Sequence, residues 1–166
     1  MPSSSRVGTP QNLSLDGTHD ILLFTYESGF PQGKLALSFG QTPRKITGVQ
    51  KVAQVFTKIL MTPAGSDPIR PSHGTDFLNY VMGSNLGSEP ADANLRIRDA
   101  ISSAETQTKA LLQGGRDYDS QLRSATMFDY EITGDTITMF VKIITSAGTE
   151  AAVAIPFPQT DLQVNA

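Results

Sequence analysis

The chain has 166 residues, of which 39% are hydrophobic, and a formal net charge of -3. This length supports one domain with a sizeable core and is too short for two large ones. Acidic and basic residues are scattered along the chain, so no electrostatic footprint for nucleic acid is present. The chain contains no cysteine, which excludes disulfides, thiolate catalysis and cysteine-based zinc sites. It also has no apolar signal core and no membrane-spanning run, so we expect no membrane partner.

The N-terminal part of the chain carries little that could be buried. Residues 1–19 are rich in Ser, Pro, Gly, Asn and Thr and predict a flexible arm. We expect a single domain over residues 20–158 and a short tail at 159–166. Apolar and aromatic runs at 20–28 and 34–40, separated by "GFPQG", predict a loose hairpin at the start of this domain.

The clearest helix is predicted over residues 46–62, because apolar side chains recur there at three- and four-residue steps. Thr47 followed by Gln50 has the spacing of a capping box, and Pro63 ends the helix. The apolar face consists of Val49, Val52, Ala53, Phe56, Ile59 and Leu60, and the polar face consists of Gln50, Lys51, Gln54 and Lys58.

Two further helices are predicted. A short one covers 75–82, with Gly83 at its end. A long one begins near Ser88 and Pro90 and continues to the glycine pair at 114–115. Its thin apolar stripe consists of Leu95, Ile97, Ile101, Ala104, Thr108, Leu111 and Leu112.

After residue 115 the hydrophobic period changes to two. The runs 124–132, 135–145 and 149–157 are rich in β-branched and aromatic residues and are joined by "TGD" and "SAG". This pattern predicts a three-stranded antiparallel meander whose proline-rich last strand lies at an edge. The predicted fold class is therefore α+β, with helices packed on a small antiparallel β-meander and an N-terminal arm and hairpin.

The stretch 60–77, "LMTPAGSDPIRPSHGTDF", combines three prolines with two glycines and predicts a rigid connector between helices. Gly65 and Gly74 can adopt positive φ, and the prolines hold the chain extended. Arg70 could pair with Asp67 or Asp76, or donate to loop carbonyls.

Catalytic and metal-binding patterns are weak. The two histidines, His19 and His73, are far apart in the sequence, and we expect His73 to form loop hydrogen bonds. "DYD" at 117–119 resembles the start of a calcium loop but lacks the later glycine and glutamate, so a solvated turn is expected. Glycoside hydrolysis needs two carboxylates about 5 to 9.5 Å apart, and no motif pairs Glu89, Glu105 or Glu131. We predict no catalytic residue, cofactor or metal.

A helix ending in "ILMTPAGSDPIRPSHGTDFLNYVMG", a polar gap and then "RDAISSAE" resemble the baseplate wedge or sheath-initiator proteins of contractile phage tails. These proteins have relatives in type VI secretion baseplates. The order of elements matches over residues 46–156, roughly two-thirds of the chain. The residues that match the connector motif of this family are Thr62, Pro63, Gly65, Arg70, Pro71, Gly74 and Phe77.

One departure from the family pattern lies in the long helix. Where the family has Glu-Pro-Arg, this chain has Glu105-Thr106-Gln107, so only the glutamate carries over. The resemblance implies that Glu105 contacts neighbouring wedge proteins. Without the proline, the helix can continue to Gln113.

The resemblance implies a non-enzymatic component of the virion, made in the bacterial host's cytoplasm and present in six copies around the tail axis. Its implied partners are the tail sheath protein, baseplate wedge proteins and tail tube or hub proteins. Unpaired edge groups of the meander would dock the first sheath ring. The candidate docking residues are Thr136, Thr138, Phe140, Lys142, Ile144, Ala151, Val153 and Ile155. The alternative is a peptidoglycan-cleaving, lysozyme-like enzyme, because family members have carried a lysozyme label.

Overall fold

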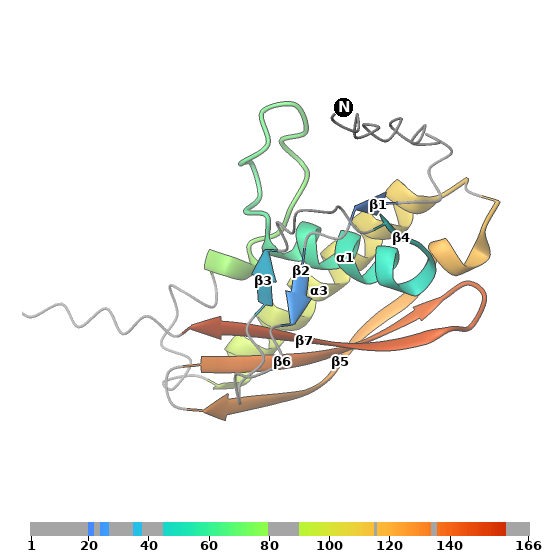
Figure 1. The fold of residues 1–166 in the computed structure, drawn as a ribbon. Coiled ribbons are helices and arrows are strands. Elements are labelled where there is room, and N and C mark those ends of the chain that lie inside the picture. Colours follow the sequence, from blue (N-terminus) through green and yellow to red (C-terminus); the bar gives the residue numbers. More distant parts are fainter. Residues whose placement is uncertain are drawn as a thin grey trace, which may run out of the picture.

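The structure, a computed structural model, describes residues 20–21, 24–26, 35–37, 45–79, 90–114, 116–133 and 136–158. In this part of the chain, helices pack on a three-stranded antiparallel sheet, which confirms the α+β fold class (Figure 1). The predicted arm at 1–19, the tail at 159–166 and the cap at Gly83 lie outside the described residues.

The sheet is formed by β5 (Leu122–Thr133), β6 (Thr136–Thr145) and β7 (Glu150–Pro158) in the order β5-β6-β7. Both strand pairs are antiparallel, so the predicted meander is confirmed. The β-branched and aromatic residues of these runs suit a pleated, half-buried surface. β6 is the central strand and pairs with a neighbour on each side.

One face of this sheet lies in the core. Met139, Val141 and Ile143 alternate along β6 and are at most 1% exposed. Ile155 of β7 is also fully buried, and Val153 packs against the same cluster. Strict alternation of side chains along a strand explains why these residues share a face.

Two helices cover the core face of the sheet. α1 (Gly48–Met61) packs on β6 and β7, and α3 (Pro90–Leu112) packs on β5 and against α1 (Figure 1). Burial of each large apolar side chain contributes about 1.5–3 kcal/mol. The buried apolar residues of the helices are Val52, Phe56, Ile59 and Leu60 in α1 and Ile97, Ala100, Ile101 and Ala104 in α3.

Two details of the predicted helix faces are wrong. Lys51 and Gln54, assigned to the polar face of α1, are only 7% and 5% exposed. Leu95 and Leu111, assigned to the apolar stripe of α3, are 59% and 47% exposed. Leu95 lies two residues before the buried Ile97, which corresponds to a rotation of about 200° around a helix, so the two cannot share one face.

The N-terminal strands form two small pairs. β2 (Phe24–Tyr26) pairs with β3 (Leu35–Leu37) in antiparallel fashion, which confirms a hairpin within the predicted ranges. β1 (Asp20–Ile21) pairs instead with β4 (Lys45–Ile46), directly before α1. The start of the predicted hairpin therefore belongs to a different pair.

Candidate functional site

In the structure, the connector consists of residues 62–77, which follow the end of α1. Hydrogen bonds close the base of this loop, where its two ends meet. Thr75 N–H donates to the Thr62 carbonyl at 2.8 Å, and Ala64 N–H donates to the Thr75 carbonyl at 3.0 Å. A parallel bridge between Pro63 and Thr75 results. The Thr75 hydroxyl also donates to the Leu60 carbonyl at 2.7 Å, which ties the connector to the end of α1. Both ends of the connector are thus held together.

Gly74 lies at the tightest point of this base. Its φ of +100° confirms the expected positive value, as does the φ of +79° at Gly65. A Cβ atom at position 74 would lie 2.4 Å from the Thr62 carbonyl oxygen, which is closer than real side chains approach. Only glycine fits here, because both the backbone conformation and the space exclude a side chain.

Gln107 of α3 holds Gly74 from the other side. Its Oε1 accepts from Gly74 N–H at 2.9 Å, and its Nε2 donates to the Gly74 carbonyl at 2.8 Å. Both backbone polar groups of Gly74 are therefore bound by one side chain. Sequence reasoning identified Gln107 only as a departure from Glu-Pro-Arg. In the sequence, the signal that could have marked Gln107 is its position two residues after Glu105, where the resembled Glu-Pro-Arg motif has an arginine.

The tip of the connector is ordered by a side chain that binds the backbone. Asp67 Oδ1 accepts from Ile69 N–H at 2.9 Å and from Arg70 N–H at 3.2 Å. Asp67 therefore binds the backbone of Arg70 and not its guanidinium, so of the alternatives considered for Arg70 the ion pair with Asp67 is not formed. His73 N–H donates to the Arg70 carbonyl, and the buried His73 Nε2 has no hydrogen-bond partner within the described residues.

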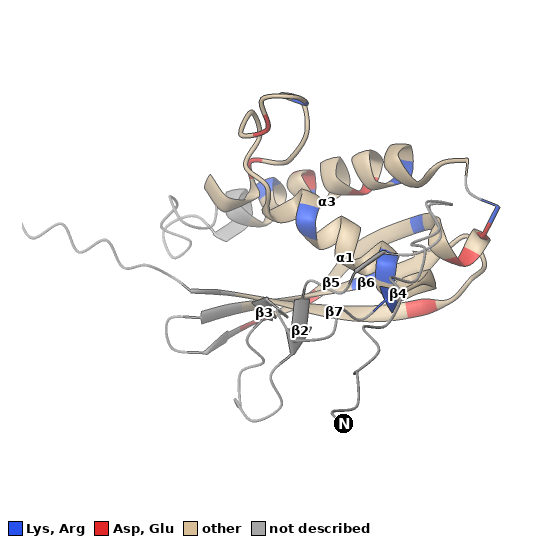
Figure 2. Ribbon diagram, turned by 45° about the horizontal axis from the view of Figure 1, so that its top comes forward, with Lys and Arg blue, Asp and Glu red and all other residues tan. Residues whose placement is uncertain are grey.

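The structure brings the seven matched motif residues into this single loop. Phe77, at its end, is fully buried and begins a helical turn over 77–79. Arg70, Pro71 and Gly65 are exposed. The connector projects beyond α1 and α3 in two views (Figures 1 and 2). It is anchored in the core at one end and presents its middle to solvent.

The start of α1 is capped by a distant segment. Thr47 is the N-cap residue but forms no side-chain capping bond, so the predicted capping box is wrong. Instead, Gly48 N–H donates to Ser120 Oγ at 3.2 Å. Ser120 lies in the 3-10 turn η1 (Tyr118–Ser120) and donates to Asp117 Oδ2 at 2.6 Å. A serine oxygen at this position satisfies one of the unpaired N–H groups of the helix.

The "DYD" segment was expected to be a solvated turn, but its side chains form hydrogen bonds with other elements of the fold. Asp119 Oδ1 accepts from Thr145 Oγ1 at 3.0 Å, which links the turn to the end of β6. The Ser120 hydrogen bond, a bond from Asp119 N–H and the charge of Lys51 lower the pKa of the Asp117 carboxyl below 3.8. Each stabilises the charged carboxylate. Within the described residues, no group of three His, Asp or Glu side chains could hold a metal.

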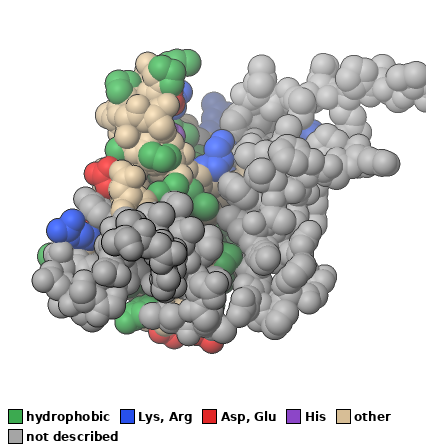
Figure 3. Space-filling model, turned by 90° about the vertical axis from the view of Figure 1, so that its left-hand side faces the viewer, with side chains coloured by type: hydrophobic (Ala, Val, Ile, Leu, Met, Phe, Trp, Pro, Cys, Tyr) green, Lys and Arg blue, Asp and Glu red, His purple; other side chains and the backbone are tan. Residues whose placement is uncertain are grey.

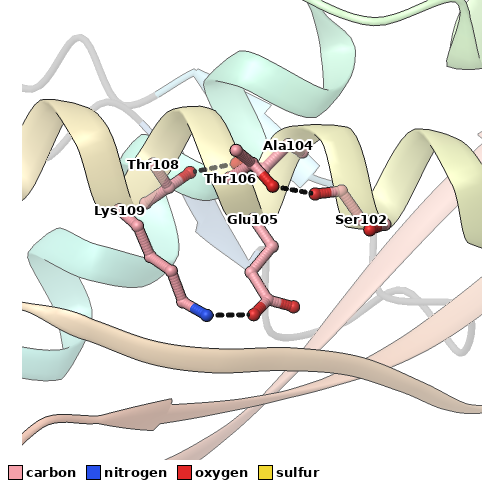
Figure 4. Close-up of polar contacts among 6 residues, drawn as sticks. All are labelled: Ser102, Ala104, Glu105, Thr106, Thr108 and Lys109. Atoms are coloured by element: carbon pink, nitrogen blue, oxygen red, sulfur yellow. Dashed lines mark hydrogen bonds and ion pairs between the residues drawn. The ribbon is translucent and has the colours of Figure 1, made fainter.

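Glu105 projects from α3 toward β5 and pairs with Lys109 one turn later (Figure 4). It borders a groove of about 170 Å³ between these two elements. Among the described carboxylates, only Glu105 lines this groove, and Glu131 is exposed elsewhere on β5. The candidate Glu89 lies outside the described residues. The groove is lined by Arg98, Ile101, Ser102, Glu105, Ala125, Thr126 and Met127.

The structure separates the candidate docking residues into two groups. Those of β6 belong to a strand that is paired on both sides, so its backbone cannot accept another strand. Thr138, Phe140, Lys142 and Ile144 are partly exposed on the outer face, where Lys142 pairs with Glu150 at 2.7 Å. On β7, Ile155 is buried and Val153 packs against the core, while Ala151 is half-buried. The side chain of Thr136 is not described.

The described residues of α3 carry charges of both signs. Positive and negative side chains are interspersed along α3 (Figure 2). Neither helix in the described part of the chain combines the length and apolarity needed to cross a bilayer.

No protein-family model and no curated protein matches the chain. Among solved structures, it is similar to the crystal structure of a "putative tail lysozyme" from Geobacter sulfurreducens, with 13% sequence identity and a TM-score of 0.47. The similarity covers 68% of this chain and 92% of that protein. A similarity of this size assigns neither a family nor an activity to the chain.

Proposed function

We propose that this chain is a structural component of the inner baseplate of a contractile phage tail, where it starts sheath assembly by pairing β7 with a strand of the first sheath ring. Two features support the proposal: the resemblance of the connector motif and the regular edge of the meander. The docking mechanism rests on one structural observation, the regular register of the outer strand β7.

The two outer strands of the sheet differ in their suitability for strand addition. β5 contains register shifts between Leu122 and Ser124 and between Met127 and Asp129. Bulges of this kind twist an edge away from further pairing. β7 pairs with β6 without a shift from Glu150 to Pro158. Within the described sheet, β7 is therefore the outer strand with the straighter backbone.

The pairing segment we propose is residues 150–153 of β7, which precede the two prolines of the strand. Proline lacks the N–H group that a ladder needs, so Pro156 and Pro158 limit the docking segment at that end. Each added backbone hydrogen bond contributes about 0.5–1.5 kcal/mol net. Several such bonds in each of six copies would position a ring of sheath subunits.

The proposed partners are the tail sheath protein at β7, baseplate wedge proteins at Glu105 and tail tube or hub proteins, in the assembled virion. We propose no enzymatic activity. Among the described residues, the groove beside Glu105 is lined by one carboxylate, which pairs with Lys109. Hydrolysis of a glycosidic bond uses two carboxylates.

Proline substitution along β7 tests the docking mechanism. In an antiparallel edge strand, N–H groups point alternately toward the neighbour and away from it. Of Ala151→Pro and Ala152→Pro, one therefore removes a bond to β6 and the other removes a donor from the outer edge. We expect the outer-edge variant to keep its melting temperature and to stop sheath polymerisation, while tube and baseplate still form.

Electron microscopy of tails produced with each variant measures this outcome. Ala152→Thr, which retains the N–H group on an exposed β-branched side chain, serves as the control and should permit a normal sheath. Normal sheaths on baseplates that contain the outer-edge variant would refute strand docking at residues 150–153.

A further inference from the structure

We propose that the connector tip, residues 68–71, docks on another baseplate protein, with Ile69 entering an apolar pocket and Arg70 pairing with a carboxylate at the pocket's rim. The identity of the partner rests on the proposed function. The docking surface itself follows from the exposure, order and charge of the connector.

The tip exposes its apolar side chain almost completely. Ile69 is 86% exposed, which exceeds the value of every other large apolar side chain in the described residues. Pro68 and Pro71 beside it are also exposed. Figure 3 shows apolar atoms gathered at the end of this projection. A single exposed isoleucine is common on a protein surface, so exposure alone would not indicate a partner.

The order of the loop is the second observation. Asp67 binds two backbone amides of the tip, and Ser66 Oγ donates to the Pro63 carbonyl at 2.7 Å. Gln107 fixes Gly74 at the base. None of these contacts uses the Ile69 side chain, yet together they hold it away from the body of the protein. A loop that is ordered before binding loses little conformational freedom when it docks.

The charge at the tip indicates the kind of partner. Within the described part of the chain, the Arg70 guanidinium forms no ion pair. Asp67, the nearest carboxylate in sequence, is occupied by backbone amides. A planar guanidinium beside an apolar side chain fits a protein pocket with a carboxylate at its edge. A lipid surface would require several cations and a broader apolar face.

Incorporation into tails tests the docking surface. A phage whose own copy of the gene carries a nonsense mutation is complemented with wild-type protein, Ile69→Asp, Ile69→Val or Leu95→Asp. Leu95 is exposed on α3, so its replacement introduces the same charge at another apolar surface site. We expect at least tenfold less Ile69→Asp in purified tails, near-normal amounts of the other two variants and unchanged melting temperatures for all. Equal incorporation of Ile69→Asp and wild type would overturn the inference.

The same experiment separates this inference from the proposed function. If wild-type protein is not found in tails, the proposed function fails. If wild type and Ile69→Asp are both incorporated, the proposed function stands and the docking surface is wrong.

Charge reversal identifies the occupant of the site. Arg70→Glu should reduce incorporation, and suppressors selected in that background should replace an aspartate or glutamate of another tail protein with lysine or arginine. Suppressors that replace Glu105 of this chain would show that a second copy is the partner, and would overturn the proposed occupant. Normal incorporation of Arg70→Glu would overturn the proposed pairing of Arg70 with a carboxylate at the rim of the partner's pocket.

Discussion

The connector and the sheet are both well ordered, but different interactions hold them. In the sheet, Val141 and Ile143 are fully buried, so the summed burial of apolar side chains holds the strands against the helices. In the connector, Ile69 is exposed, and the order comes from hydrogen bonds at Asp67, Thr75 and Gln107. Burial is spread over many residues, whereas the connector depends on a few groups. Single substitutions should therefore have their sharpest effects in the connector.

Gly74→Val should produce the largest effect. A β-branched residue tolerates a φ of +100° poorly, and its Cβ would collide with the Thr62 carbonyl oxygen. Relief of this collision requires the base of the connector to open, which we expect to cost about 3 kcal/mol or more. The melting temperature should fall by roughly 6 to 12 °C.

Gly65→Val is the matched control for this substitution. Gly65 also has positive φ, but beyond its two chain neighbours no atom of the described residues lies within 4 Å of the position its Cβ would occupy. Only the cost of the left-handed conformation applies, about 1–2 kcal/mol. Equal losses for the two variants would show that the close approach at Gly74 does not matter. An unchanged melting temperature of Gly74→Val would refute the structural role of this glycine.

The contrast between burial spread over many residues and a few specific hydrogen bonds also explains which features of the structure could be predicted from the sequence. The β-meander and α1 follow from repeating side-chain patterns, such as the alternation of Met139, Val141 and Ile143 and the spacing of Val52 and Phe56. Such patterns are local and visible in a single sequence. The identity of Gly65 and Gly74 also indicated that these positions can adopt positive φ, because few residues other than glycine adopt that conformation.

Contacts between distant side chains and backbone groups could not be predicted in this way. Gln107 binds Gly74 across 33 positions, and Ser120 binds Gly48 across 72. Neither contact belongs to a periodic pattern, and the local alternative for α1, a capping box at Thr47, was wrong. The burial of Lys51 was missed for the same reason, because it depends on tertiary neighbours of α1. The docking strand and the role of Glu105 remain predictions.

Asp117→Asn tests the polar link that joins α1 to the sheet, and a smaller effect is expected. The folded-state pKa of Asp117 lies below 3.8, so its carboxylate stabilises the protein above the pKa of the unfolded state. This contribution is lost as the pH falls through the lower, folded-state pKa. Wild type should therefore exceed the variant in free energy of unfolding at pH 7, and the difference should shrink in acid below about pH 3.8.

Chemical denaturation of both proteins across this pH range measures the difference. Ser120→Ala, which removes the hydrogen bond from the Ser120 hydroxyl to the Asp117 carboxylate, should reduce the same pH dependence. A difference between wild type and Asp117→Asn that stays constant from pH 7 to pH 3 would contradict the proposed stabilisation.

Glu105→Ala should have the smallest effect on stability and the clearest effect on assembly. The Glu105 and Lys109 side chains are 23% and 38% exposed, and a pair at this spacing on a helix contributes about 0.2–0.5 kcal/mol. Gln107→Ala, two residues along the same helix, is the contrasting control. It leaves both backbone polar groups of Gly74 without their partner and should cost about 1–3 kcal/mol.

If Glu105 contacts a wedge protein, Glu105→Ala should fold normally and enter baseplates poorly, as measured by its amount in purified tails. Normal incorporation would leave Glu105 as a surface residue with a helical ion pair. Loss of turbidity of a cell-wall suspension with wild-type protein, but not with Glu105→Gln, would instead establish the enzymatic alternative.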